Sequence, residues 1–481
     1  MNNNPFNDLN RRDFLKGSSM AALMTMMGGI EIRAEDAPAA AGASATPTAA
    51  AGTNAEPALT VIPVGPTVKY GIIGMGPQGR EVATELGKLP NAPVTAICDN
   101  YASSLRRGSE VAPKAEKFDD YKKLLASPEV QAVVVATPTH KHKEIVLDAL
   151  AAGKHVYCEA PLANSIEDTK AIAAAAKAAT KVVFQSGLQL RAYPKRKFLI
   201  PFIRAGSIGS FVGARAQYHR KNEWKRPSAN PEREAALNWR LSQKTSTGLI
   251  GELGIHQLDL ISWIFKNRPN AVTGFSSIIK WNDGRDVPDT VQAVLEYPSG
   301  ANLTFDATLA NSFDSSYENI YGTDAAVMIR SGKAWIFKEN DSPLLGFEVY
   351  ARKDTFFGET GLALAAGATS QKALKANEKK GEVPDGYPNS PLYYALETFT
   401  ANTGLVGQTV ADFITNFKGG DKNAAFDPDE TKALVEQLGS LKIVAYPGWE
   451  EGLEATIIAI KANEAAVTKK RIVIPEDLFK I

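Results

Sequence analysis

Cysteine is scarce in this chain, and neither sign of charge is in excess. Only two cysteines occur among 481 residues, Cys98 and Cys158, each near the end of an apolar, strand-like run. This usage favours buried free thiols over a disulfide framework. The 54 Lys and Arg nearly balance the 53 Asp and Glu. Such a balance gives no global field that would attract nucleic acid or a membrane surface, so no nucleic-acid partner is expected.

Long apolar runs are also lacking, which bears on the first residues. A membrane span needs about 20 apolar residues, whereas residues 18–30 are only modestly apolar and rich in Gly, Ser and Thr. We therefore expect no stable membrane anchor. The paired Arg11 and Arg12, within residues 10–16, resemble a twin-arginine export signal. The sequence predicts a twin-arginine signal peptide over residues 1–34, transport by the twin-arginine export machinery, and a periplasmic or otherwise exported location.

An Ala- and Pro-rich segment, residues 35–66, follows the expected signal. It has too little apolar surface to offset the entropy cost of ordering, so we expect a flexible linker. The remaining length suits two folded domains. We place a nucleotide-binding domain at residues 67–189 and a substrate-binding α/β domain at residues 190–481.

A glycine-rich turn stands between a predicted strand at residues 68–73 and a predicted helix at residues 80–89. Gly74 permits a tight turn, Gly76 lets the backbone approach a pyrophosphate, and Gly79 lets helix and strand pack closely. The phosphates would lie at the helix N-terminus. The predicted cofactor contacts in this turn are Gly74, Met75, Gly76, Gln78 and Gly79.

An acidic residue follows the glycine turn at the sequence spacing that is typical of dinucleotide-binding domains. The next predicted strand, residues 94–98, ends at Asp99, twenty residues beyond Gly79. A carboxylate there can accept hydrogen bonds from an adenosine ribose diol. This favours NAD as the cofactor. Arg106 and Arg107 keep NADP open, although a helix surface is the simpler interpretation of both.

Strands and helices then alternate. An apolar strand at residues 132–136 is followed by a helix at 142–152 and another strand at 154–158. This rhythm predicts a parallel, doubly wound sheet with a ligand crevice beyond the carboxyl ends of its strands. Further cofactor contacts are expected at those ends, namely Thr137, Pro138, His142 and Glu159.

Four segments, in order, carry a family resemblance. They are GIIGMGPQG at 71–79, ATPTHKH at 136–142, GKHVYCEAPLA at 153–163 and GELGIHQLD at 251–259. Together they resemble the Gfo/Idh/MocA family, which includes glucose-fructose oxidoreductase and inositol dehydrogenases. The resemblance implies an N-terminal Rossmann domain and a C-terminal α/β domain with a large open, mostly antiparallel sheet. It also implies hydride chemistry on a sugar or cyclitol, and a homo-oligomer formed through the open sheet.

One position departs from the family pattern. Where the family usually has Glu-Lys-Pro, this chain has Glu159, Ala160 and Pro161. The family lysine would position the alcohol and stabilise a developing alkoxide. Ala160 supplies neither effect, so another group would have to replace it.

The resemblance also implies a catalytic histidine. Glu252 and His256 lie four residues apart in a predicted helix and would share one face, where the carboxylate could orient the imidazole. The matched family histidine makes His256 the expected general acid/base. The alternative is a core histidine paired with a neighbouring carboxylate.

Further candidates lie where the two domains should meet. Residues 218–224 bring phenol, imidazole, ammonium and indole groups, which suit gripping a sugar; a polar surface loop is the competing interpretation. His219 or Lys221 could replace the missing lysine. No role is assigned to His140 or His155, and no metal site is predicted. The expected substrate contacts are Gln189, Tyr218, Trp224 and Asp259.

Beyond residue 263 the chain is predicted to supply an antiparallel sheet and scaffold helices. β-Favouring runs occur at residues 272–281, 290–297 and 301–307, and helical patterns at 392–401 and 450–469.

Three functions follow from these expectations. The leading one is an exported NAD-dependent oxidoreductase that moves hydride between a carbohydrate hydroxyl and tightly bound nicotinamide, because an exported enzyme has poor access to free NAD. The second is a redox-neutral, NAD-dependent glycoside hydrolase or lyase, which would explain the missing lysine. The third is a non-catalytic sugar-binding relative.

Overall fold

The computed structural model describes residues 65–349, 351–356, 358–364, 387–421 and 426–481. The predicted signal peptide, and all of the predicted linker except its last two residues, lie outside the described residues.

A six-stranded parallel sheet forms the first domain, with strand order β3-β2-β1-β4-β5-β6. Its apolar strands β1, β4 and β5 are buried throughout, as a parallel sheet covered on both faces requires. The predicted doubly wound sheet is confirmed. The strands are β1 (Tyr70–Ile73), β2 (Val94–Cys98), β3 (Glu116–Phe118), β4 (Ala132–Val135), β5 (His155–Cys158) and β6 (Phe184–Ser186).

Helices cover both faces of this sheet and build two separate apolar cores. Cys98 and Cys158 are free thiols in one of these cores, as predicted. The helices between the strands are α3 (Pro77–Leu86), α4 (Ala102–Val111), α5 (Tyr121–Ala126), η1 (Thr139–Lys141), α6 (His142–Ala151) and α7 (Ile166–Ala178).

A helix from late in the chain completes the nucleotide domain. In α11 (Pro391–Lys418), the Phe399 ring packs edge-on against Tyr70 and Tyr157, with centroids 6.1 and 5.8 Å apart. Gln185 of β6 donates a hydrogen bond to the Ala395 carbonyl oxygen at 2.9 Å. A helix from the predicted second domain, residues 190–481, therefore also packs on the nucleotide domain, and the division at residue 189 remains a prediction. Nothing in the sequence pattern of α11 marked which sheet it would cover.

A ten-stranded sheet forms the second domain. Its pairs are antiparallel except β7 with β10, which are parallel, so the predicted open and mostly antiparallel sheet is confirmed. The strands are β7 (Phe211–His219), β8 (Ala271–Ser277), β9 (Thr290–Glu296), β10 (Asn302–Thr308), β11 (Ser316–Gly322), β12 (Ala325–Arg330), β13 (Lys333–Lys338), β14 (Lys353–Phe356), β15 (Glu359–Leu364) and β16 (Ile472–Val473).

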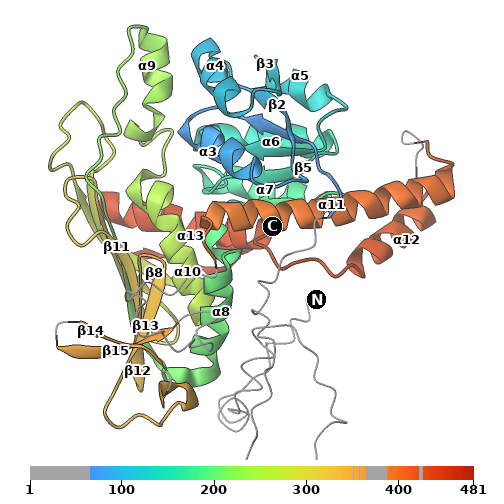
Figure 1. Cartoon of the computed structure of the whole chain (residues 1–481). Helices are drawn as coiled ribbons and strands as arrows, with labels where there is room; N and C mark the ends of the chain where they lie inside the picture. Colours follow the sequence, from blue (N-terminus) through green and yellow to red (C-terminus); the bar gives the residue numbers. More distant parts are fainter. Residues whose placement is uncertain (1–64, 350, 357, 365–386, 422–425) are drawn as a thin grey trace, which may run out of the picture.

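Only one face of this sheet is covered by helices (Figure 1). The central strands alternate between buried and exposed residues, because one side chain in two points toward the helices. The opposite face exposes Phe275, Val294 and Tyr321. The remaining helices are η2 (Gln189–Arg191), α8 (Pro194–Phe202), η3 (Ile203–Ser207), α9 (Pro231–Leu237), η4 (Trp239–Leu241), η5 (Ile250–Gly254), α10 (Ile255–Phe265), η6 (Gly346–Val349), α12 (Pro428–Gly439), α13 (Trp449–Thr468) and η7 (Glu476–Phe479).

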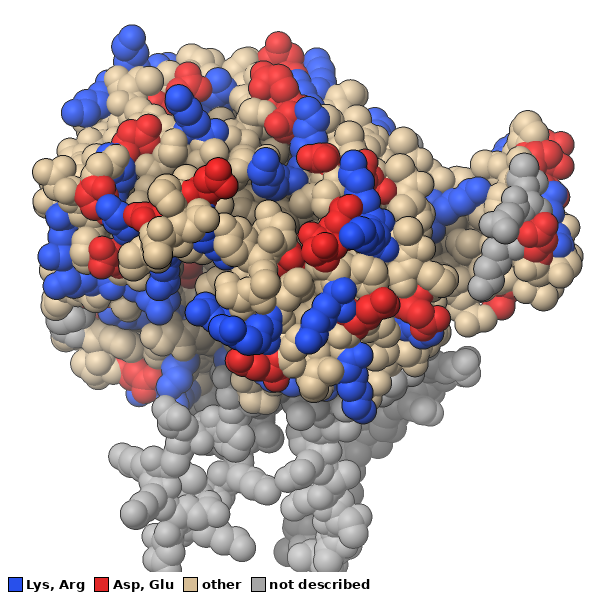
Figure 2. Space-filling view, turned by 90° about the horizontal axis from the view of Figure 1, so that it is seen from above, with Lys and Arg blue, Asp and Glu red and all other residues tan. Residues whose placement is uncertain are grey.

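The surface charge agrees with the balanced composition. Figure 2 shows Lys and Arg interspersed with Asp and Glu over the face seen from above, with no broad region of one sign. Within the described ranges, no helix is both long enough and apolar enough to cross a membrane.

Candidate functional site

The glycine turn has the geometry that a bound pyrophosphate needs. Gly74 has φ +97°, and a Cβ there would lie 2.7 Å from the Ala136 carbonyl oxygen. A Cβ on Gly79 would lie 1.8 Å from the Gly74 carbonyl oxygen, so α3 could not approach β1. A Cβ on Gly76 meets nothing within 4 Å. Gly76 therefore faces open space at the N-terminus of α3, where no side chain caps the free N–H groups.

Asp99 lies against this turn. Its carboxylate accepts hydrogen bonds from the Met75 and Tyr101 N–H groups, each at 2.9 Å. Burial raises the pKa of Asp99, and these two hydrogen bonds oppose the rise. Met75 itself is buried and uses its N–H on Asp99, so it shapes the turn. Arg106 and Arg107 are exposed on α4, in agreement with the helix-surface interpretation.

Glu159 and Gln78 meet across the crevice, beyond the end of β5. Gln78 Nε2 donates to Glu159 Oε1 at 2.9 Å. Burial raises the pKa of Glu159 to about 7. The following residue, Ala160, packs against a small apolar cluster that includes Ile255, the neighbour of His256. The position of the missing family lysine therefore lies beside the start of α10.

The turn after β4 is braced by His142. The ring Nε2 lies 2.9 Å from the Thr137 carbonyl oxygen and Nδ1 lies 3.1 Å from the Pro161 carbonyl oxygen. The side chain is buried, and burial lowers its pKa. Both ring nitrogens of His142 therefore lie against backbone carbonyl groups, and its contact with cofactor remains a prediction. Thr137 Oγ1 is buried without a hydrogen-bond partner, and Pro138 immediately precedes η1, so the contacts of both residues with cofactor remain predictions.

Glu252 lies where the two domains meet. Its carboxylate accepts from the Thr247 N–H at 3.1 Å and Oγ1 at 2.9 Å, and from Thr139 Oγ1 at 3.4 Å. Arg240 Nε lies 3.5 Å away. None of the hydrogen bonds found among the described residues joins Glu252 to His256. The expected pairing of Glu252 with His256 is not seen, because the carboxylate is bonded to Thr139, Thr247 and Arg240 instead.

His256, in the first turn of α10, is partly exposed, but its Nδ1 is buried without a hydrogen-bond partner. Burial lowers the pKa of His256 to about 4. The imidazole is therefore neutral at pH 7 and can accept a proton.

Arg240, which lies beside Glu252, also lies near two tryptophan rings. The Arg240 guanidinium lies 4.4 Å from the Trp239 ring centroid and 5.9 Å from that of Trp224. His140 lies 6.1 Å from the Trp239 ring, with Nδ1 buried and unpartnered. The predicted Trp224 thus lies near Arg240 and Trp239, two residues that the sequence analysis did not single out. Trp239 and Arg240 belong to no motif, so only their residue types could have indicated them.

Of the other candidates from residues 218–224, Tyr218 and His219 lie on different faces of the ten-stranded sheet. Tyr218 packs against the core beneath the helices. His219 points to the open face, where Nε2 lies 2.5 Å from Asp306 Oδ2 and Nδ1 lies 3.2 Å from the Phe313 carbonyl oxygen. The prediction that His219 replaces the lysine is wrong, because alternate residues of β7 face opposite sides. Lys221 is exposed and remains a prediction.

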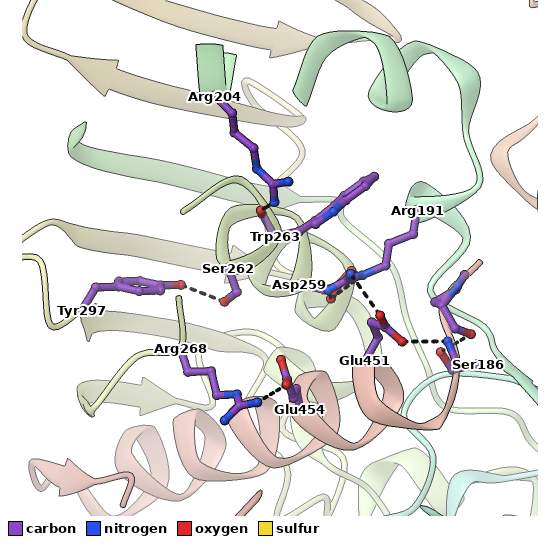
Figure 3. Close-up of polar contacts among 12 residues, drawn as sticks. Ser186, Arg191, Arg204, Asp259, Ser262, Trp263, Arg268, Tyr297, Glu451 and Glu454 are labelled. Atoms are coloured by element: carbon purple, nitrogen blue, oxygen red, sulfur yellow. Dashed lines mark hydrogen bonds and ion pairs between the residues drawn. The ribbon is translucent and has the colours of Figure 1, made fainter. Parts of the chain in front are cut away.

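Asp259 belongs to a second cavity, of about 400 Å³, between α10 and α13. The Arg191 Nη2 and Nε atoms donate to its carboxylate at 2.8 and 3.0 Å (Figure 3). Asp259 is only 3% exposed and is paired with Arg191, and its contact with substrate remains a prediction. Figure 3 also shows Arg268 bonded to Glu454, so much of the charge lining this cavity is paired. Gln189 is partly exposed on η2 and remains a prediction.

No grouping of three or more His, Cys, Asp or Glu side chains suited to a metal ion occurs in the part of the chain that the structure describes.

Comparison with protein families decides what this crevice serves. Residues 68–187 match the oxidoreductase family model described as an NAD-binding Rossmann fold, and residues 201–328 match the GFO/IDH/MocA C-terminal domain. Together the matches span more than half of the chain. The chain belongs to the Gfo/Idh/MocA family. This member of the family is an NAD(P)-dependent oxidoreductase, and its first domain is the NAD-binding domain.

Similar proteins include enzymes of carbohydrate chemistry. Levoglucosan dehydrogenase of Pseudarthrobacter phenanthrenivorans is 26% identical over 367 residues, covering 68% of this chain and 92% of that protein. The 2,7-anhydro-N-acetylneuraminate hydratase of Escherichia coli is 28% identical over 270 residues, covering 54% and 67%. A solved levoglucosan dehydrogenase complex with NADH and levoglucosan has the same fold, with a TM-score of 0.59 at 19% identity, and covers 85% of this chain and 100% of that one.

The residues present fit an NAD molecule at the glycine turn. Gly76 leaves space for the pyrophosphate, the N-terminus of α3 faces it, and Asp99 stands beside it for the adenosine ribose. The turn at Thr137 and the Gln78–Glu159 pair lie along the same strand ends, toward the group of residues around Glu252.

Proposed function

We propose that this protein is an exported oxidoreductase that transfers hydride between a sugar or cyclitol hydroxyl and tightly bound NAD, with His256 moving the hydroxyl proton. The observation that carries the proposal is the place of His256 at the start of α10, beside Ala160, where the family lysine is missing. Burial keeps the imidazole unprotonated at pH 7, which is the form that accepts a hydroxyl proton.

The proposed step balances within the site. NAD held at the turn of Gly74, Gly76 and Gly79 would supply a hydride acceptor for the substrate C–H bond in the oxidation direction. The O–H bond also breaks, its proton goes to His256, and a carbonyl forms. Glu252, held by Thr139, Thr247 and Arg240, would fix substrate hydroxyls, and Trp224 and Trp239 would pack against the sugar ring.

Two measurements on purified protein test this proposal. Mass spectrometry of the nucleotide released on denaturation should find NAD, because Asp99 suits a free ribose diol. Sugars and cyclitols deuterated at each carbon should then pass deuterium to the nicotinamide. NADP in place of NAD, or no label transfer from any substrate, would contradict the proposal.

A redox-neutral reaction is the second candidate. Ala160 supports it, because a group that stabilises an alkoxide is missing, and the relative named a hydratase supports it too. In that reaction the hydride would leave the substrate transiently and return to it. A glycoside panel discriminates: released aglycone or a hydrated product without net oxidation favours this candidate, whereas an accumulated ketone favours the first.

Export is supported by the Arg11–Arg12 pair and the short apolar stretch after it. Carriage of a folded protein would let NAD be loaded before transport. Replacing both arginines with lysine should leave the protein in the cytoplasm of a cell that has twin-arginine machinery. Unchanged export of the double variant would contradict this assignment.

Homo-oligomer formation is supported by the open face of the ten-stranded sheet. Phe275 is 59% exposed there, and Val294 and Tyr321 are also exposed. Apolar side chains gathered on one sheet face indicate an association surface. Sedimentation should show a multimer that Phe275→Asp disrupts, and a monomeric wild type would exclude it.

A further inference from the structure

Helix α9 is a surface element that the substrate domain sends toward the nucleotide domain. It lies in the long connection between β7 and η5, and none of its residues is buried. Figure 1 shows α9 rising beside the nucleotide domain, toward α4. A helix without a buried face depends on a few specific contacts for its position.

Arg233 supplies such contacts. Its guanidinium lies 3.2 Å from the centroid of the Tyr101 ring, and its Nη2 donates to Ser104 Oγ at 3.2 Å. Asn230 caps the helix by accepting from the Arg233 N–H at 2.9 Å. The planar guanidinium is therefore stacked and hydrogen-bonded across the domain boundary, an arrangement that lysine cannot reproduce.

Both partners of Arg233 adjoin the residue expected at the adenosine ribose. The Tyr101 N–H donates to Asp99 Oδ1 at 2.9 Å, and Ser104 is buried one turn along α4. Burial raises the pKa of Asp99, whereas hydrogen bonds and the Arg233 charge oppose the rise. The substrate domain thus places a positive charge next to the carboxylate at the nucleotide end.

The base of α9 is firmly held and continues into the substrate end. Asn238 Nδ2 donates to the Arg226 carbonyl oxygen at 2.9 Å, and the Arg226 N–H donates to Asn238 Oδ1 at 2.7 Å. This pair closes the loop that bears α9. Trp239 and Arg240, which lie next to Glu252, follow directly. One short segment therefore spans both ends of the crevice.

We propose that α9 is a strap across the nucleotide crevice and that Arg233 is a cofactor-site residue contributed by the substrate domain, which retains the adenosine half of NAD. The inference rests on the proposed place of Asp99 at the ribose. With the strap in place, NAD leaves only after the Arg233–Tyr101 stack opens. Slow release is what an enzyme that recycles one bound cofactor needs.

The test is the dissociation rate of NADH from the full chain, followed by nucleotide fluorescence after mixing with excess NAD. Arg233→Ala should release NADH at least about tenfold faster, since a stacked, hydrogen-bonded guanidinium is lost. Arg233→Lys should release NADH at a rate between those of the wild type and Arg233→Ala, because lysine keeps the charge and loses the planar stack. The control Glu232→Ala removes an exposed charge from the same helix and should leave the rate unchanged.

Circular dichroism and thermal unfolding check that each variant folds. If Arg233→Ala is destabilised, Tyr101→Leu removes the same stack from the other side and should give the same faster release. Release at the wild-type rate, or slower, in folded variants would overturn the strap. The measurement needs no turnover, so failure of the hydride-transfer proposal would show separately, as wild-type protein that binds NADH but transfers no label.

Discussion

The two ends of the crevice are built by different means. At the nucleotide end, backbone geometry does most of the work: Gly74, Gly76 and Gly79 shape one turn, and Asp99 is tied to it through N–H groups. At the substrate end, side chains from η1, η4 and η5 converge at Glu252. The nucleotide end depends on the sequence spacing of residues within a segment of about 30 residues. The substrate end depends on how the two domains pack together.

The difference indicates which kind of substitution should damage nucleotide binding and which should damage turnover. A backbone cradle is lost when a Cβ is added, whereas a group of converging side chains is lost when one polar group is removed. Substitutions at the two ends should therefore separate nucleotide binding from turnover.

Removal of the His256 imidazole should have the largest effect. His256→Ala should lower turnover by about 10²- to 10⁴-fold, the usual contribution of a positioned acid/base group. Binding of NADH should be unchanged, since the glycine turn lies between β1 and α3. Steady-state rates and a fluorescence titration measure the two separately. An equal loss of turnover and of NADH binding would contradict the separation of the substrate end from the nucleotide end.

The pH dependence of turnover sharpens the same point. Burial lowers the pKa of His256 to about 4, so the proton-accepting form persists far below the ordinary histidine range. Oxidation should therefore stay constant from neutral pH downward and fall only as pH approaches about 4. A rate profile with an acid limb near 6.5, the ordinary value, would show that the imidazole is more hydrated than its burial implies.

Two glycines three residues apart should respond in opposite ways. Gly76→Val places atoms in open space at the nucleotide position, so it should weaken NADH binding by roughly a hundredfold, as a displacement of about 1 Å can, and spare thermal stability. Gly79→Ala forces a backbone clash and should lower the free energy of unfolding by about 1–3 kcal/mol. Denaturant unfolding and binding titrations distinguish them, and a stable Gly79→Ala would contradict the packing argument.

His155 offers a comparison with His256, because burial lowers the pKa of each to about 4. His155 Nδ1 accepts the Val183 N–H at 2.9 Å inside the nucleotide domain. Between pH 6.5 and 4 the unfolded chain takes up a proton there and the folded chain does not, so the free energy of unfolding should fall, by up to about 1.4 kcal/mol per pH unit. His155→Gln should remove this contribution in pH-dependent denaturation. An identical pH slope in both proteins would contradict it.

The smallest effect is expected at His219, which faces Asp306 on the open face of the sheet. His219→Ala should change turnover by less than about twofold, in line with a surface substitution away from the site. A loss of turnover comparable with that of His256→Ala would show that His219 takes part in catalysis.

Much of the nucleotide end could be predicted, because glycine spacing and strand periodicity are local. The three-residue strands β3 and β6 lack long apolar runs, and the return of α11 to this domain left no local mark. At the substrate end, His256 was found through a family motif. The contacts of Glu252 with Thr139 and Arg240 depend on tertiary packing, which no local sequence pattern marks.

Single-turnover hydride transfer tests the central claim most directly. NAD-loaded protein is mixed with sugars and cyclitols, and the absorbance of reduced nicotinamide is followed in the wild type and in His256→Ala. We predict reduction in the wild type with at least one such substrate, and a loss of at least about a hundredfold in the variant. Equal rates in both proteins, or no reduction by any carbohydrate, would contradict the claim.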